Sequence, residues 1–145
     1  MDLKIIKYDS PEYKEMVRLR YRILREPLGL DFTEKDLERD KNDILIVAYY
    51  PNSEQMIGCC ILSPLNDHTV QLRQMAVDNH GQRKGNGSEI LLYAEKIALE
   101  RNFGYVYMHA RQVAIDFYKK HGYAIESDIF TEVGIPHFEM LKQLK

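Results

Sequence analysis

The residues best suited to chemistry lie in a glycine-rich connection between an expected strand and an expected helix. The apolar strand should end at Val77, and an amphipathic helix should start near Lys84. The connection carries three glycines and two cations, namely Gly81, Gly85, Gly87, Arg83 and Lys84. Such a loop exposes unpaired backbone N–H groups at a helix N-terminus, where the helix dipole adds partial positive charge. The pattern therefore predicts an anion site, most often for a phosphate group.

Two other phosphate-binding patterns fail in this loop. The Gly-x-x-x-x-Gly-Lys-Ser/Thr pattern is absent, because Gly81 and Gly85 are one residue too close and no Lys-Ser/Thr pair follows. The dinucleotide pattern Gly-x-Gly-x-x-Gly fails because position 90 is Ile. A nucleotide-phosphate protein using this loop is therefore disfavoured.

A second motif follows downstream, Ala114-Ile-Asp-Phe-Tyr-Lys-Lys-His-Gly-Tyr123. Together with Gln82-Arg83-Lys84-Gly85-Asn86-Gly87, it resembles the acyl-CoA N-acyltransferases of the GNAT superfamily. Their phosphate loop has the pattern Gln/Arg-x-x-Gly-x-Gly/Ala, and their later helix has Ala-x-x-Phe-Tyr-x-x-x-Gly-Phe/Tyr. The stretch Leu72-Arg-Gln-Met-Ala-Val-Asp also resembles the family's strand before the loop, and the order of elements agrees over essentially the whole chain.

The resemblance implies acetyl-CoA or coenzyme A as co-substrate, with its diphosphate at the N–H groups of residues 83 to 88. Side chains at Gly85 and Gly87 would block close backbone approach. The pantetheine arm would lie where the strand ending at Val77 splays from the next strand. The cofactor-binding residues so implied are Met75, Ala76, Val77, Gln82, Arg83, Lys84, Gly85, Asn86, Gly87, Ser88, Phe117 and Tyr118. Alternatively, the glycines form only a tight turn into the helix.

Tyr118 is the leading catalytic candidate. Acetyl transfer from a thioester to an amine expels a thiolate whose conjugate acid has a pKa near ~8.5, while a tyrosine has a pKa near ~10. A neutral tyrosine can therefore hydrogen-bond to the sulfur and protonate it, and such help is typically worth ~10²–10⁴ in rate. The alternative is that Tyr118 only packs on the helix's apolar face beside Phe117.

The acceptor amine must also lose a proton, and no single residue marks itself as the base. We expect Glu132 and His137 in the final hairpin to be catalytic candidates, with His109 at the end of the splayed strand as a third. Each could instead be an ordinary polar residue. Where the family often carries an Asn that contacts the cofactor or a water, this chain has Arg111, so that role is not transferred.

The sequence predicts one α/β (α+β) GNAT-like domain over residues 1–145, in the order β-α-α-β-β-β-α-β-α-β-β. The sheet should be mixed, mostly antiparallel, of about seven strands, with helices flanking it, and the resemblance implies a splay between the fourth and fifth strands. Ser10 and Thr33 should cap the first two helices, and Gly104 should take a left-handed cap after the third. Expected strands are Leu3–Tyr8, Ile44–Tyr50, Met56–Leu62, Thr69–Val77, Tyr105–Ala110, Tyr123–Phe130 and His137–Leu144; the later helices are Lys84–Arg101 and Val113–His121.

Composition sets the broad class. At 145 residues the chain suits a single domain, and its formal charge of −2 disfavours a nucleic-acid binder. No signal peptide or membrane span is evident, so we expect a cytoplasmic protein without membrane partners. Cys59 and Cys60 should be core residues on opposite faces of a strand, and no metal-ligand spacing is present. The arginines of the first helix should be mostly solvated, with one possible at a substrate entrance.

These observations favour an N-acetyltransferase that moves an acetyl group from acetyl-CoA directly to a primary amine in a ternary complex. The alternative is a non-catalytic acyl-CoA-binding or regulatory module, against which Tyr118 argues. The acceptor stays open between small molecules and peptide or protein amines. Homodimers are common in the family, but the sequence marks no interface.

Overall fold

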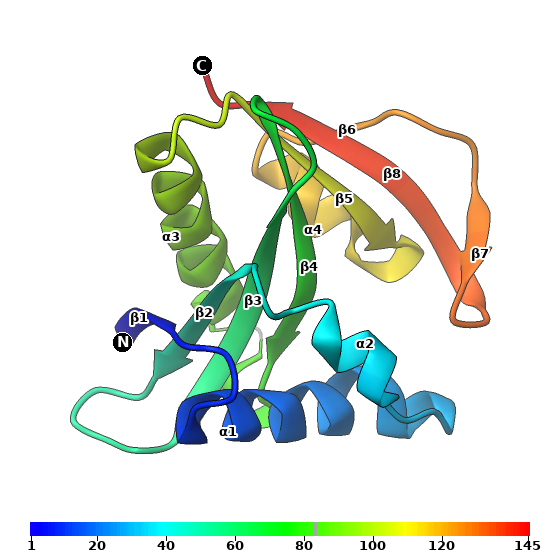
Figure 1. The fold of residues 1–145 in the computed structure, drawn as a ribbon. Helices are drawn as coiled ribbons and strands as arrows, with labels where there is room; N and C mark the ends of the chain where they lie inside the picture. Colours follow the sequence, from blue (N-terminus) through cyan, green and yellow to red (C-terminus); the bar gives the residue numbers. More distant parts are fainter. Residues whose placement is uncertain (83) are drawn as a thin grey trace.

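The computed structural model describes residues 1–82 and 84–145, and in these residues eight strands form one open sheet (Figure 1). The order across the sheet is β1-β2-β3-β4-β5-β8-β6, with β7 paired to β8. The strands are β1 Asp2–Ile6, β2 Ile44–Tyr49, β3 Met56–Pro64, β4 Thr69–Val77, β5 Tyr105–Arg111, β6 Ala124–Ile125, β7 Phe130–Glu132 and β8 Ile135–Gln143. The α-helices are α1 Pro11–Arg20, α2 Glu34–Glu38, α3 Asn86–Glu100 and α4 Ile115–Lys120.

The two faces of the sheet are covered by different helices. Ile46 and Cys60 point into a core shared with α3 and α4, whereas Val47 and Cys59 point into a core shared with α1. This division follows from the alternation of side chains along a strand, and it confirms that the adjacent cysteines face opposite sides. No helix of the described residues is both long and apolar enough to cross a membrane.

Strands β2, β3 and β4 pair antiparallel in chain order, and this meander contains a bulge beside the predicted site. Cys59 pairs with Ala76 and Ile61 pairs with Arg73, so β4 carries one extra residue opposite Cys60. Gln74 lies at this bulge with a φ of 55°. A bulge bends its strand and increases the local twist, which turns the end of β4 away from its other neighbour.

That neighbour is β5, the only strand parallel to β4 in the described sheet. Their pairing runs from Thr69–Tyr105 to Leu72–Met108 and stops there. Beyond this point β4 remains paired to β3, while β5 remains paired to β8 as far as Arg111–His137. The predicted splay between the fourth and fifth strands is therefore confirmed.

The N-terminal helices start as predicted. The Ser10 side chain accepts a hydrogen bond from the Tyr13 N–H, and Thr33 and Asp36 form a reciprocal capping box. Beyond α1 the chain continues as a π-helical stretch, Tyr21–Arg25, and a 3₁₀ turn, Glu26–Leu28. These segments carry Leu24 and Arg25 to the splayed side of the sheet, where both line the cavity described below.

The arginines of the expected first helix differ in exposure. Arg18 and Arg22 are exposed, as expected of most of them, whereas Arg20 is only 1% exposed. Its guanidinium donates to the fully buried Asp40 at 2.8 Å, and Asp40 also accepts from Arg73 at 2.8 Å and from the Tyr13 hydroxyl at 2.7 Å. A buried charge needs such partners to offset its loss of hydration. Arg20 also donates to the Gln74 side chain at 3.3 Å, which links α1 to the bulge in β4.

Other differences concern the ends of elements. Helix α3 begins at Asn86 rather than near Lys84, and the left-handed position after it is taken by Asn102, with φ 69°, rather than by Gly104. The last predicted helix is a 3₁₀ turn, Gln112–Ala114, followed by α4. The expected strand 123–130 is replaced by two short strands, β6 and β7, each paired to β8, which raises the described strand number to eight.

Candidate active site

The splay between β4 and β5 opens into a cavity of about 980 Å³. Its walls come from the ends of both strands, the start of α3, helix α4 and the turn between β7 and β8. The glycine loop and the predicted catalytic residues therefore share one space. Of the predicted site residues, those lining it are Met75, Ala76, Val77, Gln82, Gly85, Gly87, Ser88, His109, Phe117, Tyr118, Glu132 and His137.

Two of the predicted residues that the structure describes are not part of this lining. Lys84 is exposed and Asn86 opens α3, and neither contributes to the cavity wall. Arg83 lies outside the described residues. The contacts of Lys84 and Asn86 with a cofactor therefore stay a prediction, as do those of the residues that line the cavity.

The glycine loop enters α3 through a left-handed residue. Gly85 has φ 79°, a conformation that a side chain disfavours, and it directly precedes the helix. Gly87 lies against α4, since a Cβ added there would meet the Phe117 ring at 3.5 Å. The Gln82 side chain donates to the Val77 carbonyl at 2.9 Å, which fixes the loop to the end of β4.

Helix α4 is tied to the start of α3 by a polar contact. Ser88 Oγ lies 2.8 Å from His121 Nε2, and the His121 ring lies 5.0 Å from the Phe117 ring. No role was assigned to His121 from the sequence, which placed it only at the end of an expected helix. The structure instead gives it a role in joining the two helices that carry the loop and Tyr118.

The backbone of β4 on this wall has lost its partner strand. Met75 to Val77 lie beyond the last β4–β5 pair, although Ala76 and Val77 still pair with β3. Ala76 is buried, and all three residues face the cavity. This edge of β4 is where an extended ligand could pair with strand backbone as a further strand does.

Tyr118 lies at the base of the cavity and is 7% exposed. Its ring packs edge-on against Phe117 and Tyr123, at centroid distances of 5.1 and 5.8 Å. Burial raises the pKa of Tyr118 above its ordinary value, and the positive charge of Arg111 opposes that shift. The residue is therefore a neutral phenol near pH 7. A raised pKa favours hydrogen-bond donation to a sulfur over complete transfer of the proton.

At the other end of the cavity, side chains of β5, β7 and β8 form a chain of contacts. The Tyr107 hydroxyl donates to Glu139 and lies 3.0 Å from His109 Nε2. Because the hydroxyl has only one proton, His109 must donate its Nε2–H to the Tyr107 oxygen. His109 Nδ1 lies 2.9 Å from Glu132 Oε1, so the same ring also contacts the carboxylate of β7. These contacts link β5 to both β7 and β8.

His137 completes this group. It is 3% exposed, and its Nδ1 lies 3.0 Å from the Ile135 carbonyl, which can only accept, so Nδ1 carries the proton. In neutral His137 the unprotonated Nε2 then faces Glu132 Oε2 at 3.6 Å. The arrangement offers a proton acceptor beside a carboxylate that can stabilise the resulting imidazolium.

The cavity residues that the motifs did not assign include Arg25 and Arg111. The Arg111 guanidinium donates to the Leu24 carbonyl at 3.0 Å and the Arg25 guanidinium to the same oxygen at 3.4 Å. Arg111 was visible in sequence only as a departure from the family's usual Asn. Arg25 was visible only as one of several arginines in the first helix.

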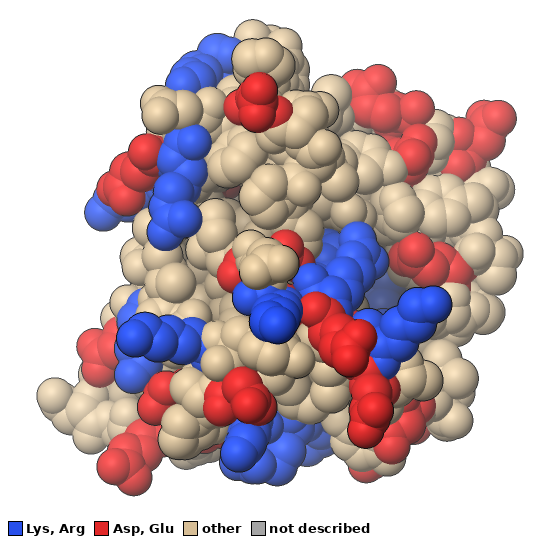
Figure 2. Space-filling model, in the orientation of Figure 1, with Lys and Arg blue, Asp and Glu red and all other residues tan. Residues whose placement is uncertain are grey.

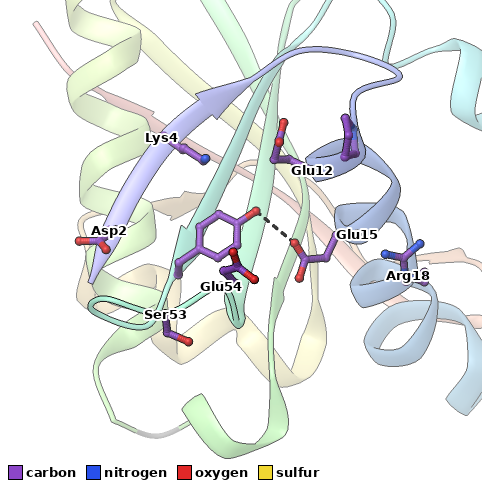
Figure 3. A pocket seen from close by; sticks show the side chains of 9 residues that line it. Asp2, Lys4, Glu12, Glu15, Arg18, Ser53 and Glu54 are labelled. Carbon is purple, nitrogen blue, oxygen red and sulfur yellow. Dashed lines mark hydrogen bonds between the residues drawn. The ribbon is translucent and has the colours of Figure 1, made fainter.

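A second hollow, of about 530 Å³, lies between β1, α1 and the β2–β3 turn (Figure 3). The Tyr49 hydroxyl donates to Glu15 there at 3.1 Å. Its charged lining is mostly acidic, comprising Asp2, Glu12, Glu15, Glu54, Lys4 and Arg18. It contains no predicted site residue, and its charge has the wrong sign for a diphosphate. We therefore assign the candidate active site to the larger cavity.

No group of three or more His, Cys, Asp or Glu in residues 1–82 and 84–145 is arranged to hold a metal ion.

Comparison with known proteins identifies the class to which this fold and site belong. The sequence model of the acetyltransferase (GNAT) family matches residues 10–123. YjcF of Bacillus subtilis, named an uncharacterized N-acetyltransferase, is 33% identical over 139 residues, covering 95% of this chain and 97% of YjcF. YyaT of the same organism is 34% identical over 99 residues, so the match spans 68% of this chain and 65% of YyaT.

Solved structures share the fold along the whole chain. An N-acetyltransferase from Lactobacillus plantarum has a TM-score of 0.83 and 27% identity, covering 100% of both chains. A GNAT family acetyltransferase from Elizabethkingia anophelis, solved with acetyl-CoA bound, has a TM-score of 0.74 at 16% identity, covering 98% of this chain and 97% of that one. This second likeness is one of fold alone.

The chain belongs to the acetyltransferase (GNAT) family, and the resemblance found in its two motifs is confirmed. Acetyl-CoA-dependent acetylation of an amine is the general kind of reaction of this family, and the chain is an acyltransferase.

Proposed function

We propose that the protein transfers an acetyl group from acetyl-CoA directly to the primary amine of an acceptor, with both substrates bound together. The observation that carries the proposal is a single cavity with the glycine loop at one end, Glu132 and His137 at the other, and Tyr118 in its wall. A solved member of the same fold holds acetyl-CoA. Two substrates entering from opposite ends could therefore meet beside Tyr118.

The reaction begins with deprotonation of the acceptor. An alkylammonium of pKa ~10.4 costs about 4–5 kcal/mol to deprotonate at neutral pH, so a positioned base is useful. His137 Nε2 accepts this proton, and Glu132 stabilises the imidazolium that forms. The role fits the tautomer set by the Ile135 carbonyl.

The neutral amine then attacks the carbonyl carbon of the thioester. A C–N bond forms, the C–S bond breaks, and the sulfur leaves as a thiolate. The nitrogen loses its second proton in the same step, and this proton neutralises the thiolate, so that the products are the amide and coenzyme A. The Tyr118 hydroxyl donates a hydrogen bond to that sulfur and stabilises its developing charge. The backbone N–H groups near Gly85 and Gly87 bind the diphosphate, and the open edge of β4 from Met75 to Val77 binds the pantetheine arm.

Thermal unfolding with added nucleotides tests the co-substrate. Coenzyme A at 100-fold over its Kd should stabilise the protein by ~2.7 kcal/mol, a rise of several degrees in Tm for a domain of this size. ATP and NAD should produce no comparable shift. A Tm that does not respond to coenzyme A would contradict the proposal.

Thiol release against a panel of amines tests catalysis. Cys59 and Cys60 are both 0% exposed, so a thiol reagent should react slowly with the folded protein itself. Coenzyme A binding without amine-dependent thiol release would instead fit an acyl-CoA-binding module.

A further inference from the structure

The charges lining the cavity are strongly unequal. Among the described residues of its wall, five are Lys or Arg and only Glu132 is a carboxylate; the cations are Arg25, Arg39, Arg73, Arg111 and Lys120. Figure 2 shows Lys and Arg side chains near the middle of the displayed face, beside a hollow and interspersed with Asp and Glu side chains. Some of these cations have partners in the protein, so the unpaired ones indicate where a ligand's charge belongs.

Arg73 is already neutralised, because it contacts Asp40 at 2.8 Å and Asp43 at 3.1 Å. Lys120 ends α4, the helix whose Phe117 and His121 contact the start of α3. Lys120 therefore belongs to the end of the cavity where the diphosphate is proposed to bind. Arg39 reaches the Gln71 side chain at 3.4 Å.

Arg25 and Arg111 differ from these residues because they lie together without a carboxylate partner. Both donate to the Leu24 carbonyl, and no carboxylate oxygen in residues 1–82 and 84–145 lies within 4.0 Å of either guanidinium. Burial lowers the pKa of both side chains. The more distant carboxylates of Asp36 and Glu132 oppose that shift at Arg25, and Glu132 opposes it at Arg111. Arg25 is held further by the Phe32 ring, whose centroid lies 4.7 Å away. Two half-buried positive charges that share one carbonyl oxygen lower the stability of the protein unless an anion binds beside them.

The pair lies at the acceptor end of the cavity. Arg111 faces His137 across the β5–β8 ladder, and His137 lies beside Glu132. The glycine loop, in contrast, contacts α4 through Gly87 and Ser88. An anion bound by Arg25 and Arg111 would therefore be close to the groups proposed to deprotonate the amine, and distinct from the diphosphate.

We propose that the acceptor is a zwitterion, an amine that also carries a carboxylate or phosphoryl group, and that Arg25 and Arg111 bind this anionic group. The assignment rests on the proposed amine acetylation. Guanidinium groups match both kinds of anion through paired N–H donors. Glu132 and His137 receive the ammonium end of the same molecule. A purely polycationic acceptor would bring further positive charge to two unpaired arginines and is disfavoured.

Matched acceptors test the proposal. We would compare the amino acids glycine, β-alanine, γ-aminobutyrate and ε-aminocaproate with alkylamines of the same chain length. Aminoalkyl phosphonates would be compared with both sets. Spermidine would serve as the polycationic acceptor. At least one acid-bearing amine should exceed its matched alkylamine by tenfold or more in kcat/KM. Preference for carboxylate or phosphonate would identify which anion is bound. Equal kcat/KM for acid-bearing and acid-free amines, or preference for spermidine, would overturn the inference.

Variants assign the preference to the two arginines. The quantity compared is kcat/KM for the acid-bearing amine divided by kcat/KM for its matched alkylamine. Arg25→Gln and Arg111→Gln should each lower this ratio about tenfold. Arg25→Lys and Arg111→Lys should retain part of the preference because the positive charge remains. Arg18→Gln, from α1 but outside this cavity, is the matched control and should keep the wild-type ratio. An unchanged ratio in both Gln variants would contradict the assignment.

Coenzyme A binding, measured by calorimetry on the same variants, separates the two proposals. If coenzyme A binding falls in parallel with the ratio, the pair serves the co-substrate and the inference is wrong. If wild type binds coenzyme A but no acid-bearing amine reacts or binds, the inference again fails, while the co-substrate assignment stands. Failure to bind coenzyme A at all would contradict the proposed function itself.

Discussion

Tyr118 combines an apolar environment with access to the cavity, and this combination determines what its hydroxyl can do. In Tyr118→Phe the ring packing against Phe117 and Tyr123 is retained, and only the hydrogen-bond donor is lost. We expect kcat to fall by ~10²–10⁴, with little change in the Kd of coenzyme A. Steady-state kinetics and calorimetry would measure the two effects. Tyr105→Phe, at the first residue of β5, is the control. If Tyr118→Phe lost coenzyme A binding but kept its kcat, the acid role of Tyr118 would be contradicted.

The base can be assigned in a similar way, because His137 and Glu132 are expected to have unequal roles. His137→Gln removes the proton acceptor, so kcat should fall by ~10²–10⁴. Glu132→Gln leaves that acceptor in place and should cost less, since only stabilisation of the imidazolium and the contact to His109 are lost. Rates at saturating acetyl-CoA would show the order of the two effects. Glu126→Gln, an exposed change near β6, should be neutral, and a larger loss in Glu132→Gln than in His137→Gln would reverse the two roles.

At the scale of elements, the site depends on the close approach of β3, β4 and α3 at Gly58. A Cβ at this position of β3 would lie 2.7 Å from the Ala76 carbonyl oxygen of β4 and 2.7 Å from Ile90 Cδ1 of α3. The Ile90 methyl can move, but the backbone of β4 cannot move without shifting the cavity wall. Gly58→Ala should therefore cost about 1–3 kcal/mol in unfolding free energy and weaken coenzyme A binding.

The control for this change is Gly104→Ala. No atom lies closer than 3.7 Å to a Cβ built at Gly104, and its φ is not in the left-handed range, so the substitution should be nearly neutral. Urea unfolding and calorimetry on both variants would give the comparison. If Gly58→Ala were as stable and as competent in binding as Gly104→Ala, the wall of the cavity would be more deformable than its contacts indicate.

The elements also show why some features could be predicted and others could not. The loop of Gly85 and Gly87 and the helix of Phe117 and Tyr118 are local motifs, so their residue types and spacing identify them directly. Gly104 was predicted as the left-handed cap, but Asn also adopts that conformation, and Asn102 lies two residues earlier in the connection. The splitting of strand 123–130 into β6 and β7 depends on pairing with β8, which no local pattern encodes.

Over the whole molecule, the least predictable features join residues that are distant in sequence. Arg111 meets the Leu24 carbonyl across 87 positions, and Arg20 meets Asp40 only because α1 packs over the sheet. Helical periodicity cannot separate a buried, paired arginine from a solvated one. The coenzyme A end of the site could therefore be proposed from sequence, whereas the charge of the acceptor end required the fold.

The adjacent cysteines of β3 make the stability of the whole molecule sensitive to alkali. Burial raises the pKa of Cys59 to about 12 and that of Cys60 well above its ordinary value. In the unfolded chain both thiols titrate near ~8.5. Above that pH the unfolded state releases protons that the folded state retains, so the unfolding free energy must fall as pH rises. Each thiol should contribute about 1.4 kcal/mol per pH unit until its folded pKa is reached.

Urea unfolding between neutral pH and about pH 10 would measure this slope. The variant Cys59→Ala/Cys60→Ala should be less stable at neutral pH, because two buried side chains are truncated, but its slope should be flatter by roughly 2.8 kcal/mol per pH unit. Tyr49, whose pKa burial raises to about 12, adds a similar loss only above its unfolded value near ~10. Equal slopes in wild type and the double variant below that pH would show that the thiols are not the groups responsible. The expected difference arises because one pair of adjacent residues places a thiol in each of the two cores.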